Sequence, residues 1–186
     1  MTATTTVLFT LLLSQAPAAR MFAVDPAESH IAFHLDHSLH SVDGRATQLE
    51  AKAQLSDAGE LRTMARVQVA LLDSGDRNRD ANMRAVMEAD RFPYVVLKGN
   101  GRITPPTSFP ATVSITLNAE VDVHGVKRPM QIPLEVTFAD ASTARVRGTF
   151  VVSLDAHHVE RPSLLFKKVD DACKVKIDLL LRQQAG

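Results

Sequence analysis

The side chains best able to do chemistry gather in one short stretch, HIAFHLDHSLH, which contains His30, His34, His37 and His40. Imidazoles at close spacing are the ligands that zinc or haem would need. On a β-strand, however, residues three apart point to opposite faces, so His34 and His37 share a face only if a turn intervenes. We therefore expect these histidines to face solvent or to line the mouth of a cavity. A metal-dependent enzyme that uses the His30–His40 cluster is the alternative.

The remaining reactive residues give weaker signals. His157 and His158 are adjacent in AHHVERP, and neighbouring histidines rarely ligate one ion together, so a surface loop is expected there. Cys173 is the single cysteine and alternates with apolar residues, which predicts a buried small hydrophobe. G-x-S-x-G, H-E-x-x-H, G-x-G-x-x-G and Walker motifs are absent from the sequence. We predict no catalytic residues, no metal ligands and no enzymatic activity.

Composition narrows the class of protein. The 186 residues carry 21 Lys and Arg against 21 Asp and Glu, so charge favours neither nucleic acid nor an acidic membrane surface as a partner. The hydrophobic fraction of 45% is enough for a buried core, and the length suits one domain.

Most of the chain has the alternating pattern of half-buried strands. The firmest case is the segment 113–123, where six apolar residues alternate with polar ones. HGVKRP follows as a turn, and alternation resumes over 130–138, which predicts a hairpin. Further strands are expected in 49–55, 65–71, 146–154 and 173–181, in SHIAFHLDH and in YVVLKGNGRI, about eight in all.

Eight long antiparallel strands must bury their apolar faces, and a closed barrel does so without leaving sheet edges exposed. The predicted fold is therefore all-β, an antiparallel eight-stranded lipocalin-like β-barrel whose interior is filled or holds one small ligand. A two-sheet sandwich is the structural alternative. One stretch differs: Met83, Val86 and Met87 recur at helical spacing in NRDANMRAVMEADRFP, which predicts one short α-helix near residues 78–90. Asp76 or Asn78 is the expected N-cap.

The N-terminal segment has features of an export signal. TVLFTLLL is too short to span a bilayer, so no transmembrane anchor is expected, and SQAPAA offers an A-x-A cleavage pattern. The preceding MTATT lacks the usual basic residues. We expect residues 1–19 to be a signal peptide, residues 20–186 to form one barrel domain, and the protein to be periplasmic or secreted.

Three separated motifs resemble those of the YceI family, the lipid- or polyisoprenoid-binding proteins of bacteria, over Phe22 to Arg182. The first is FAVDPAESHIAFHLDHSLHSVDGRA, in which the matching positions are Asp25, Ser29, His37 and Gly44. The second is the predicted helix and the Phe-Pro step after it, with matches at Arg79, Asp80, Met83, Phe92 and Pro93. Asn82 stands where the family usually has His. The third is AEVDVHGVKRPMQIPLEV, with matches at His124, Gly125, Val126 and Pro129 and a spacing one residue shorter before the proline.

The resemblance implies an exported protein that holds a long apolar molecule inside its barrel. The expected partner is an apolar lipid-like small molecule such as a polyisoprenoid, an isoprenoid quinone or a similar lipid, with no cofactor required. Transport, storage and stress protection are the roles that the family leaves open, and a homodimer is one expected assembly. A ligand-free structural or interaction module is the further alternative.

The candidate binding residues come from the apolar faces and the helix. The cavity candidates are Phe33, Val67, Val69, Met83, Met87, Val96, Ile115, Leu117, Val121, Leu134, Phe138, Phe150 and Val152. Methionine suits such a wall because it adapts to irregular shapes. The polar candidates at the mouth, which would orient a head group, are His37, Arg79, Asp80 and Asn82.

Overall fold

The computed structural model describes residues 19–37, 41–161, 163–164 and 167–184. Its strands are β1 (Ala19–Val24), β2 (His30–Leu35), β3 (Val42–Ala46), β4 (Leu49–Ser56), β5 (Glu60–Gln68), β6 (Leu72–Asp73), β7 (Tyr94–Arg102), β8 (Ala111–Val123), β9 (Val126–Phe138), β10 (Thr143–Ser153), β11 (Ser163–Leu164), β12 (Lys167–Lys168) and β13 (Ala172–Gln183). The helical elements are α1 (Arg77–Val86) and the 3-10 turns η1 (Pro26–Glu28), η2 (Val69–Leu71) and η3 (Asp155–His157).

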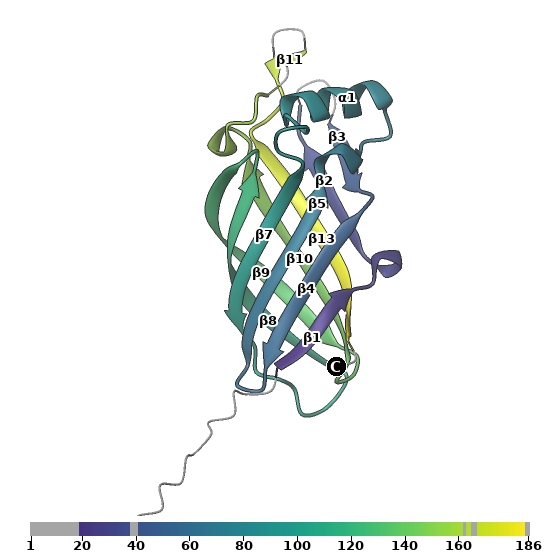
Figure 1. Ribbon diagram of the computed structural model, residues 1–186, viewed down its shortest axis with the longest axis vertical. Helices are drawn as coiled ribbons and strands as arrows, with labels where there is room; N and C mark the ends of the chain where they lie inside the picture. The colour runs from purple at the N-terminus through teal and green to yellow at the C-terminus, as the bar shows by residue number, and fades with distance from the viewer. Residues whose placement is uncertain (1–18, 38–40, 162, 165–166, 185–186) are drawn as a thin grey trace, which may run out of the picture.

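The strands form a closed antiparallel barrel (Figure 1). Its order is β1-β4-β5-β7-β8-β9-β10-β13, and β13 pairs back onto β1, so eight strands complete the ring. The predicted all-β, eight-stranded, lipocalin-like barrel with one short helix is confirmed.

Three of the strands are interrupted rather than continuous. β13 pairs with β1 through Leu181–Gln183 and with β2 through Cys173–Asp178, so β1 and β2 are two parts of one strand of the ring, interrupted by η1. The break follows from Asp25 and Pro26, because the Asp25 carboxylate accepts a hydrogen bond from the Ala27 N–H and proline cannot extend the ladder. In the same way β3 continues β4, and β6 continues β5 by pairing with β3.

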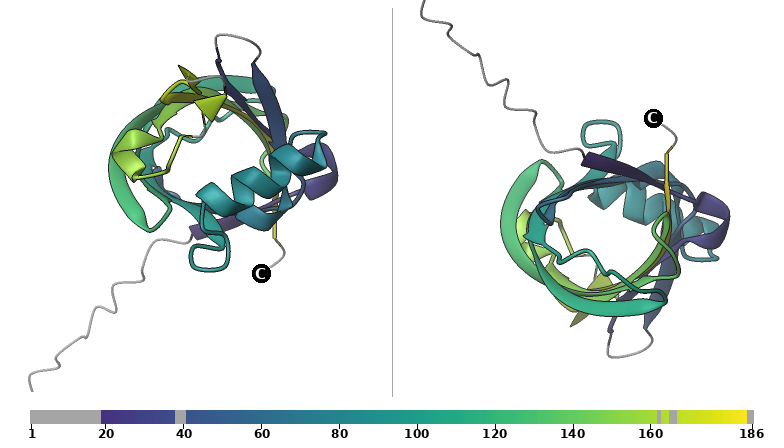
Figure 2. Two further views of the ribbon diagram at one scale, coloured as in Figure 1. Left: turned by 90° about the horizontal axis from the view of Figure 1, so that it is seen from above. Right: turned by 90° about the horizontal axis from the view of Figure 1, so that it is seen from below.

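One end of the barrel carries α1 and the turn between β8 and β9, and the other end carries the C-terminal end of β13 (Figure 1). The β8–β9 turn has only two residues, His124 and Gly125, both with positive φ, as a type I′ hairpin turn requires. Seen from above, α1 lies across part of its end of the ring (Figure 2). None of the helices in the described ranges has the length and apolarity needed to cross a membrane.

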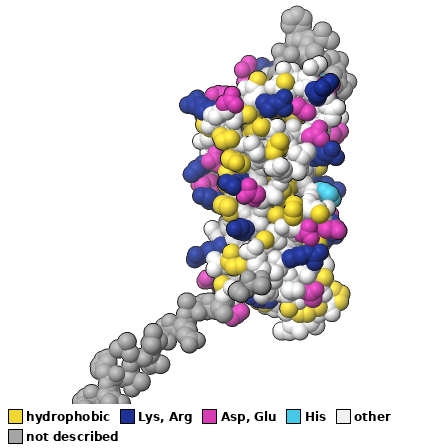
Figure 3. Space-filling view, turned by 45° about the vertical axis from the view of Figure 1, so that its right-hand side comes forward, with side chains coloured by type: hydrophobic (Ala, Val, Ile, Leu, Met, Phe, Trp, Pro, Cys, Tyr) yellow, Lys and Arg dark blue, Asp and Glu magenta, His cyan; other side chains and the backbone are white. Residues whose placement is uncertain are grey.

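The outer surface and the interior divide as alternation predicts. Charged side chains of both signs are interspersed over the visible face of the barrel (Figure 3), and the inward side chains form one apolar core. Two boundaries differ from expectation. The predicted strand 65–71 ends at Gln68 and continues as η2; the Val69 N–H still donates to the Pro93 carbonyl at 2.9 Å, in register with the β5–β7 ladder, and the chain then turns into the 3-10 helix. The helix begins at Arg77 and ends at Val86, shorter than 78–90 at its C-terminal end.

Candidate functional site

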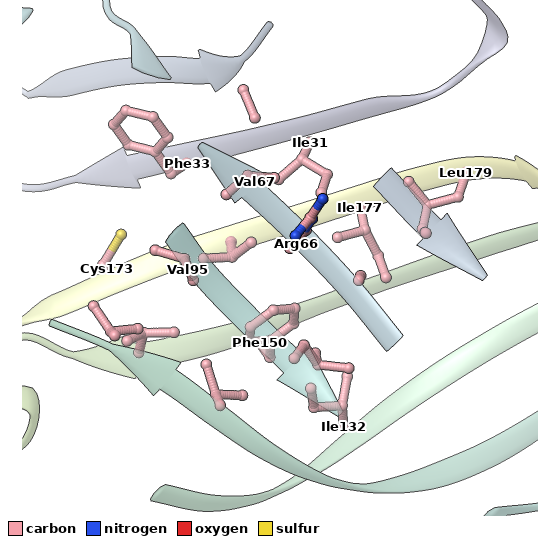
Figure 4. A pocket seen from close by; sticks show the side chains of 18 of the residues that line it. Ile31, Phe33, Arg66, Val67, Val95, Ile132, Phe150, Cys173, Ile177 and Leu179 are labelled. Carbon is pink, nitrogen blue, oxygen red and sulfur yellow. The ribbon is translucent and has the colours of Figure 1, made fainter. Parts of the chain in front are cut away.

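The barrel encloses an elongated cavity of about 610 Å³. Its wall consists almost entirely of Val, Ile, Leu, Phe, Met and Ala side chains that point inward from the strands of the ring and from α1. In the close view, the labelled side chains from several strands converge on one space, and apart from Arg66 and Cys173 they are hydrocarbon (Figure 4). The size and lining are those of a small-molecule pocket.

The interior is hollow because one wall is built from small residues. Ala51 pairs with Ala65, and Ala53 pairs with Thr63, which in turn pairs with Gly99. These residues of β4, β5 and β7 occupy inward positions where larger side chains would fill the barrel. The single hydroxyl of this wall, Thr63, donates to the Lys52 carbonyl at 3.0 Å, so it is already satisfied by the backbone.

A glycine also widens the upper part of the cavity. Gly44 on β3 lies opposite Phe33 on β2, and a Cβ at Gly44 would come within 2.1 Å of Phe33 Cζ. The bare backbone of Gly44 therefore lets the Phe33 ring lie close against the wall instead of projecting across the cavity. A glycine in the first YceI-like motif thus has a direct steric role.

The end of the cavity opposite α1 is sealed. Apolar side chains from five strands and one loop line that end, and all of them are at least nine-tenths buried: Phe22, Leu55, Ile103, Phe138, Ala144 and Leu181. The Ile103 N–H donates to the Gly59 carbonyl at 2.9 Å, which fixes the loop after β7 against the turn after β4. A ligand chain therefore cannot run through the barrel from one end to the other.

Polar side chains border the cavity at the α1 end. Asp76 is the N-cap of α1, Arg79 and Asn82 lie on α1, His37 follows β2, and Glu160 follows η3. Asp76, Asn82 and Glu160 are exposed, while Arg79 and His37 are partly buried. Within the described ranges, the cavity thus combines an apolar interior with a polar rim, which is the arrangement that an amphiphile requires.

Arg66 also reaches the cavity wall, but its charge is already paired. Its guanidinium donates to both carboxylate oxygens of Glu50 at 2.8–3.0 Å and lies over the Tyr94 ring at 4.7 Å. These contacts, led by the hydrogen bond to Glu50, raise the pKa of Arg66. The residue therefore does not add an unpaired charge to the apolar interior.

The start of α1 is fixed by hydrogen bonds to its own first turn and to the preceding loop. Asp76 is the N-cap and accepts from the N–H groups of Asn78 and Arg79 at 2.9 and 3.0 Å. These two backbone bonds lower the pKa of Asp76. Asp80 accepts from the N–H and hydroxyl of Ser74, and Arg79 Nε donates to the same hydroxyl at 3.1 Å.

The end of the helix is fixed to the β8–β9 turn. His124 Nε2 donates to Glu88 Oε1 at 2.9 Å, and the His124 ring meets the Phe92 ring edge-on with centroids 4.7 Å apart. The hydrogen bond from His124 is the main cause of a lowered pKa at Glu88. A helix held in this way at both ends is a fixed cover over part of the cavity mouth.

Eleven of the thirteen predicted cavity residues line the cavity; they are Phe33, Val67, Met83, Met87, Ile115, Leu117, Val121, Leu134, Phe138, Phe150 and Val152. Two predicted positions were wrong as lining residues. Val69 lies in η2, where it is buried outside the cavity wall. Val96 lies between Val95 and Leu97, which both point inward, so Val96 itself points outward beside Arg66. Contact of the eleven residues with a ligand stays a prediction.

Of the predicted mouth residues, His37, Arg79 and Asn82 lie at the rim. Asp80 does not, because its carboxylate turns back to Ser74 and anchors the helix. The rim positions that the sequence left unassigned are Asp76, expected only as a cap, and Glu160, which follows the two histidines of a loop. The folding of that loop onto the mouth depends on contacts distant in sequence.

The histidines of the alternative metal site do not form a metal-binding group within the described residues. His34 lies on the outer face of β2, where Nδ1 donates to Asp43 Oδ1 at 2.7 Å and Nε2 to Asp36 Oδ1 at 3.0 Å. Both ring nitrogens therefore face carboxylates, and these hydrogen bonds, Asp43 first, raise the pKa of His34. His40 lies outside the described residues. In the described part of the chain, no group of three or more His, Cys, Asp or Glu side chains could hold a metal ion.

The adjacent residues His157 and His158 differ in exposure. His158 is exposed, but the surface position predicted for His157 was wrong: this side chain is 1% exposed. His157 Nδ1 donates to the Ser153 carbonyl at 2.8 Å, which turns the ring inward at the end of β10. It packs there because η3 folds against β9.

Cys173 lies at the start of β13 and lines the cavity, as its apolar alternation suggests. Burial raises the pKa of its thiol to about 11. The thiol is therefore protonated at neutral pH and acts as a small apolar group of the wall.

Comparison with known proteins identifies the family. The YceI-like domain matches residues 22–181, which is most of the chain. The chain belongs to the YceI-like family. No curated protein sequence matches it.

Solved structures with the YceI-like fold are similar over most of their length. A polyisoprenoid binding domain from Saccharophagus degradans, implicated in plant cell wall breakdown, superposes with a TM-score of 0.73 at 15% identity, covering 88% of this chain and 98% of that one. BcnA of Burkholderia cenocepacia gives 0.70 at 16% identity, with 84% and 98% covered. The YceI protein of Campylobacter jejuni gives 0.59 at 9% identity, with 81% and 90% covered.

Several residues of the YceI-like motifs hold the frame of the barrel. Ser29 Oγ accepts from the Leu180 N–H at 2.8 Å, and Asp25 accepts from Arg182 Nε at 2.9 Å. Both residues therefore attach the segment between β1 and β2 to β13. The hydrogen bond from Arg182 is the largest cause of a lowered pKa at Asp25. These motif residues therefore explain how the cavity is formed, and the cavity residues themselves determine what it accepts.

Proposed function

We propose that this protein binds a long-chain apolar lipid, with the tail inside the barrel and the polar head at the α1 end, and that it sequesters or carries that lipid. The observation that carries the proposal is the cavity of about 610 Å³, lined almost entirely by apolar side chains and bordered by polar side chains at one end. A polyprenyl lipid or an isoprenoid quinone has the matching chemistry.

The expected affinity follows from the buried apolar area. Burying roughly 400 Å² of an isoprenoid tail at about 25 cal/mol/Å² releases on the order of 10 kcal/mol. Loss of translational freedom and ordering of the chain remove several kcal/mol, which leaves an affinity near micromolar or tighter. Hydrophobic contact alone is sufficient, so a binding protein of this kind needs no charged recognition motif and no catalytic group.

Two further points support the proposal. The Saccharophagus degradans protein with the same fold is a polyisoprenoid binding domain. The N-terminal sequence has an apolar run and an A-x-A pattern typical of export signals, so we place the protein in the periplasm or outside the cell.

The direct test is native mass spectrometry and lipid extraction of protein purified from its own host. We expect one isoprenoid lipid per barrel. A protein that is empty in every preparation would contradict the proposal.

A matched pair of helix variants tests the position of the ligand. Met83 lines the cavity, whereas Ala81 is exposed on another side of α1. We expect Met83→Trp to lower lipid occupancy with a small change in stability, and Ala81→Trp to leave occupancy unchanged. A loss of stability in Met83→Trp without loss of occupancy would instead identify the helix as packing for a ligand-free core.

A further inference from the structure

The join between β9 and β10 is paired over only part of the length of the two strands. Their ladder covers 134–138 of β9 and 144–148 of β10. Toward the α1 end, residues 126–133 and 149–153 continue as strands, but no pairing joins them. Both segments lie wholly within the described residues. We call this unpaired part of the barrel wall the β9–β10 seam.

Two prolines end the ladder at the seam. The residues that flank a two-residue hairpin turn form a hydrogen-bonded pair, and such pairs recur at every second position. Val123 and Val126 are that pair in the β8–β9 hairpin, so the odd-numbered residues of β9 direct their N–H groups toward β10. Pro133 is the next position that would bond to β10, opposite Thr149, and it has no N–H. Pro129 removes a second donor in the same way.

A groove on the outer wall lies where the ladder ends. It crosses β8, β9, β10 and β13, and its polar lining residues are Ser114, Thr116, Glu135, Arg147, Thr149 and Lys176. The apolar residues Ile115, Leu134 and Ile177 line this groove and also line the cavity. A single layer of side chains therefore separates the groove from the cavity.

Gly148 leaves the wall without a β10 side chain at this point. A Cβ at Gly148 would lie 2.6 Å from Leu134 Cδ2 and 2.9 Å from the Pro133 carbonyl oxygen. Leu134 thus lies against the bare backbone of β10. Beyond it, Ile132 and Phe150 project into the cavity from the two sides of the seam (Figure 4).

Nearer the α1 end, η3 bridges the seam. Arg128 Nε on β9 donates to the Ala156 carbonyl at 3.0 Å, and His157 Nδ1 donates to the Ser153 carbonyl at the end of β10 at 2.8 Å. Two side-chain hydrogen bonds are lost at much smaller cost than a ladder as long as the one that joins β10 to β13. The seam is therefore a place where the wall can open locally while the rest of the ring stays paired.

We propose that the β9–β10 seam is a lateral portal, through which an apolar chain passes between the outer groove and the cavity when β9 and β10 separate. This inference rests on the proposed function, because it gives the route to the same cavity. Phe22, Leu55 and Phe138 close the end opposite α1, and α1 is anchored at both of its ends. A chain that enters past α1 must thread lengthwise, whereas the seam opens the cavity from the side.

A cross-link over the seam tests the portal. Gln131 and Val151 are both exposed, and they would face each other if the register of the ladder continued. In a Cys173→Ala parent, Gln131→Cys and Val151→Cys are joined by a disulfide, or by a short bismaleimide if the two sulfur atoms are too far apart. Mass spectrometry verifies the cross-link. The matched control joins the same Val151→Cys to Lys174→Cys, its partner on β13.

The probe is retinol, an isoprenoid alcohol whose fluorescence rises in an apolar site, and stopped-flow fluorescence measures its uptake and release. We expect the seam cross-link to slow both rates at least about tenfold and to change the Kd less than about threefold, because a closed portal raises the barrier equally in both directions. The control cross-link should leave both rates as in the parent. Unchanged rates in the seam-linked barrel would overturn the portal and leave the proposed function intact. A parent barrel that binds no retinol would refute the proposed function and the portal together.

Loosening the seam should have the opposite effect. Arg128→Leu removes the donor to Ala156, so uptake and release should each become at least about threefold faster. Lys127→Leu is the matched control, because Lys127 is the adjacent exposed cation and its ion pair is with Glu120 of β8. Equal effects of the two substitutions would overturn the role of η3 in holding the seam closed.

Discussion

The contact between the β8–β9 turn and Phe92 gives a prediction with an internal control. Gly125 has φ +74°, and a Cβ there would come within 2.4 Å of the Phe92 ring. Gly75 has nearly the same φ, +76°, and a Cβ there would meet no atom within 4 Å. Substitution by alanine therefore imposes the same backbone cost at both positions, and a steric cost only at Gly125.

The expected loss in the free energy of unfolding is larger for Gly125→Ala than for Gly75→Ala. Placing alanine in the left-handed region costs about 1 kcal/mol, which is the expected loss for Gly75→Ala. At Gly125 the Phe92 ring must also move away from His124, against which it packs at 4.7 Å between centroids. Overpacking of this kind adds about 1–3 kcal/mol, so Gly125→Ala should lose about 2–4 kcal/mol in total.

Urea denaturation followed by circular dichroism measures both free energies of unfolding. In thermal unfolding, each kcal/mol corresponds to about 2–4 °C for a chain of this size. A double variant with Phe92→Leu should recover part of the excess loss at Gly125, since the smaller side chain leaves room for the methyl group. Equal losses for Gly125→Ala and Gly75→Ala would refute the steric argument and the role of Phe92 in holding α1 to the barrel.

Two further predictions concern titratable side chains. Burial raises the pKa of the Cys173 thiol from 9.0 to about 11, so its alkylation near neutral pH should be about a hundredfold slower in the folded protein than in the unfolded chain. A bound isoprenoid lipid should slow the alkylation further. Mass spectrometry follows the reaction, and rapid alkylation of the folded protein would contradict the place of Cys173 in the cavity wall. The pKa of His34 is raised above 6.5 by Asp43 and Asp36, so the stability it contributes is fully present below that value and is lost as pH rises through the raised pKa. Urea denaturation of wild type and His34→Gln should therefore show a larger difference near pH 6 than near pH 8.5, and a difference that grows with pH would be inconsistent with these ion pairs.

The sequence predicts the strands best where apolar and polar residues alternate strictly. Over 113–123 every inward position is correct, because a single change of parity would expose the whole apolar face. Val96 was misplaced because it lies in a run of three apolar residues, Val95 to Leu97. No polar residue interrupts this run, so the pattern does not tell which of the three point inward. The outward direction of Val96 follows from its two neighbours, Val95 and Leu97, which both line the cavity.

The candidate site was predictable in its apolar part and less so at its rim. Met83, Val86 and Met87 line the cavity because helical spacing places them on one side of α1. The polar rim is assembled from segments far apart in the chain, and neither Glu160 nor the burial of His157 has a local signature. Asp80 was assigned to the mouth from a charge pattern that does not distinguish a helix anchor from a ligand contact.

The pairing of β1 with β13 gives the fold a particular order of assembly. The two strands that complete the ring lie more than 140 residues apart, so the ring closes only after β13 is available, and this high contact order favours slow folding. Until then, β1 and β10 present open edges and the apolar lumen is accessible to water and to other chains. The incomplete chain is therefore the aggregation-prone form, and a chaperone that protects it should act until the last strand has joined the first.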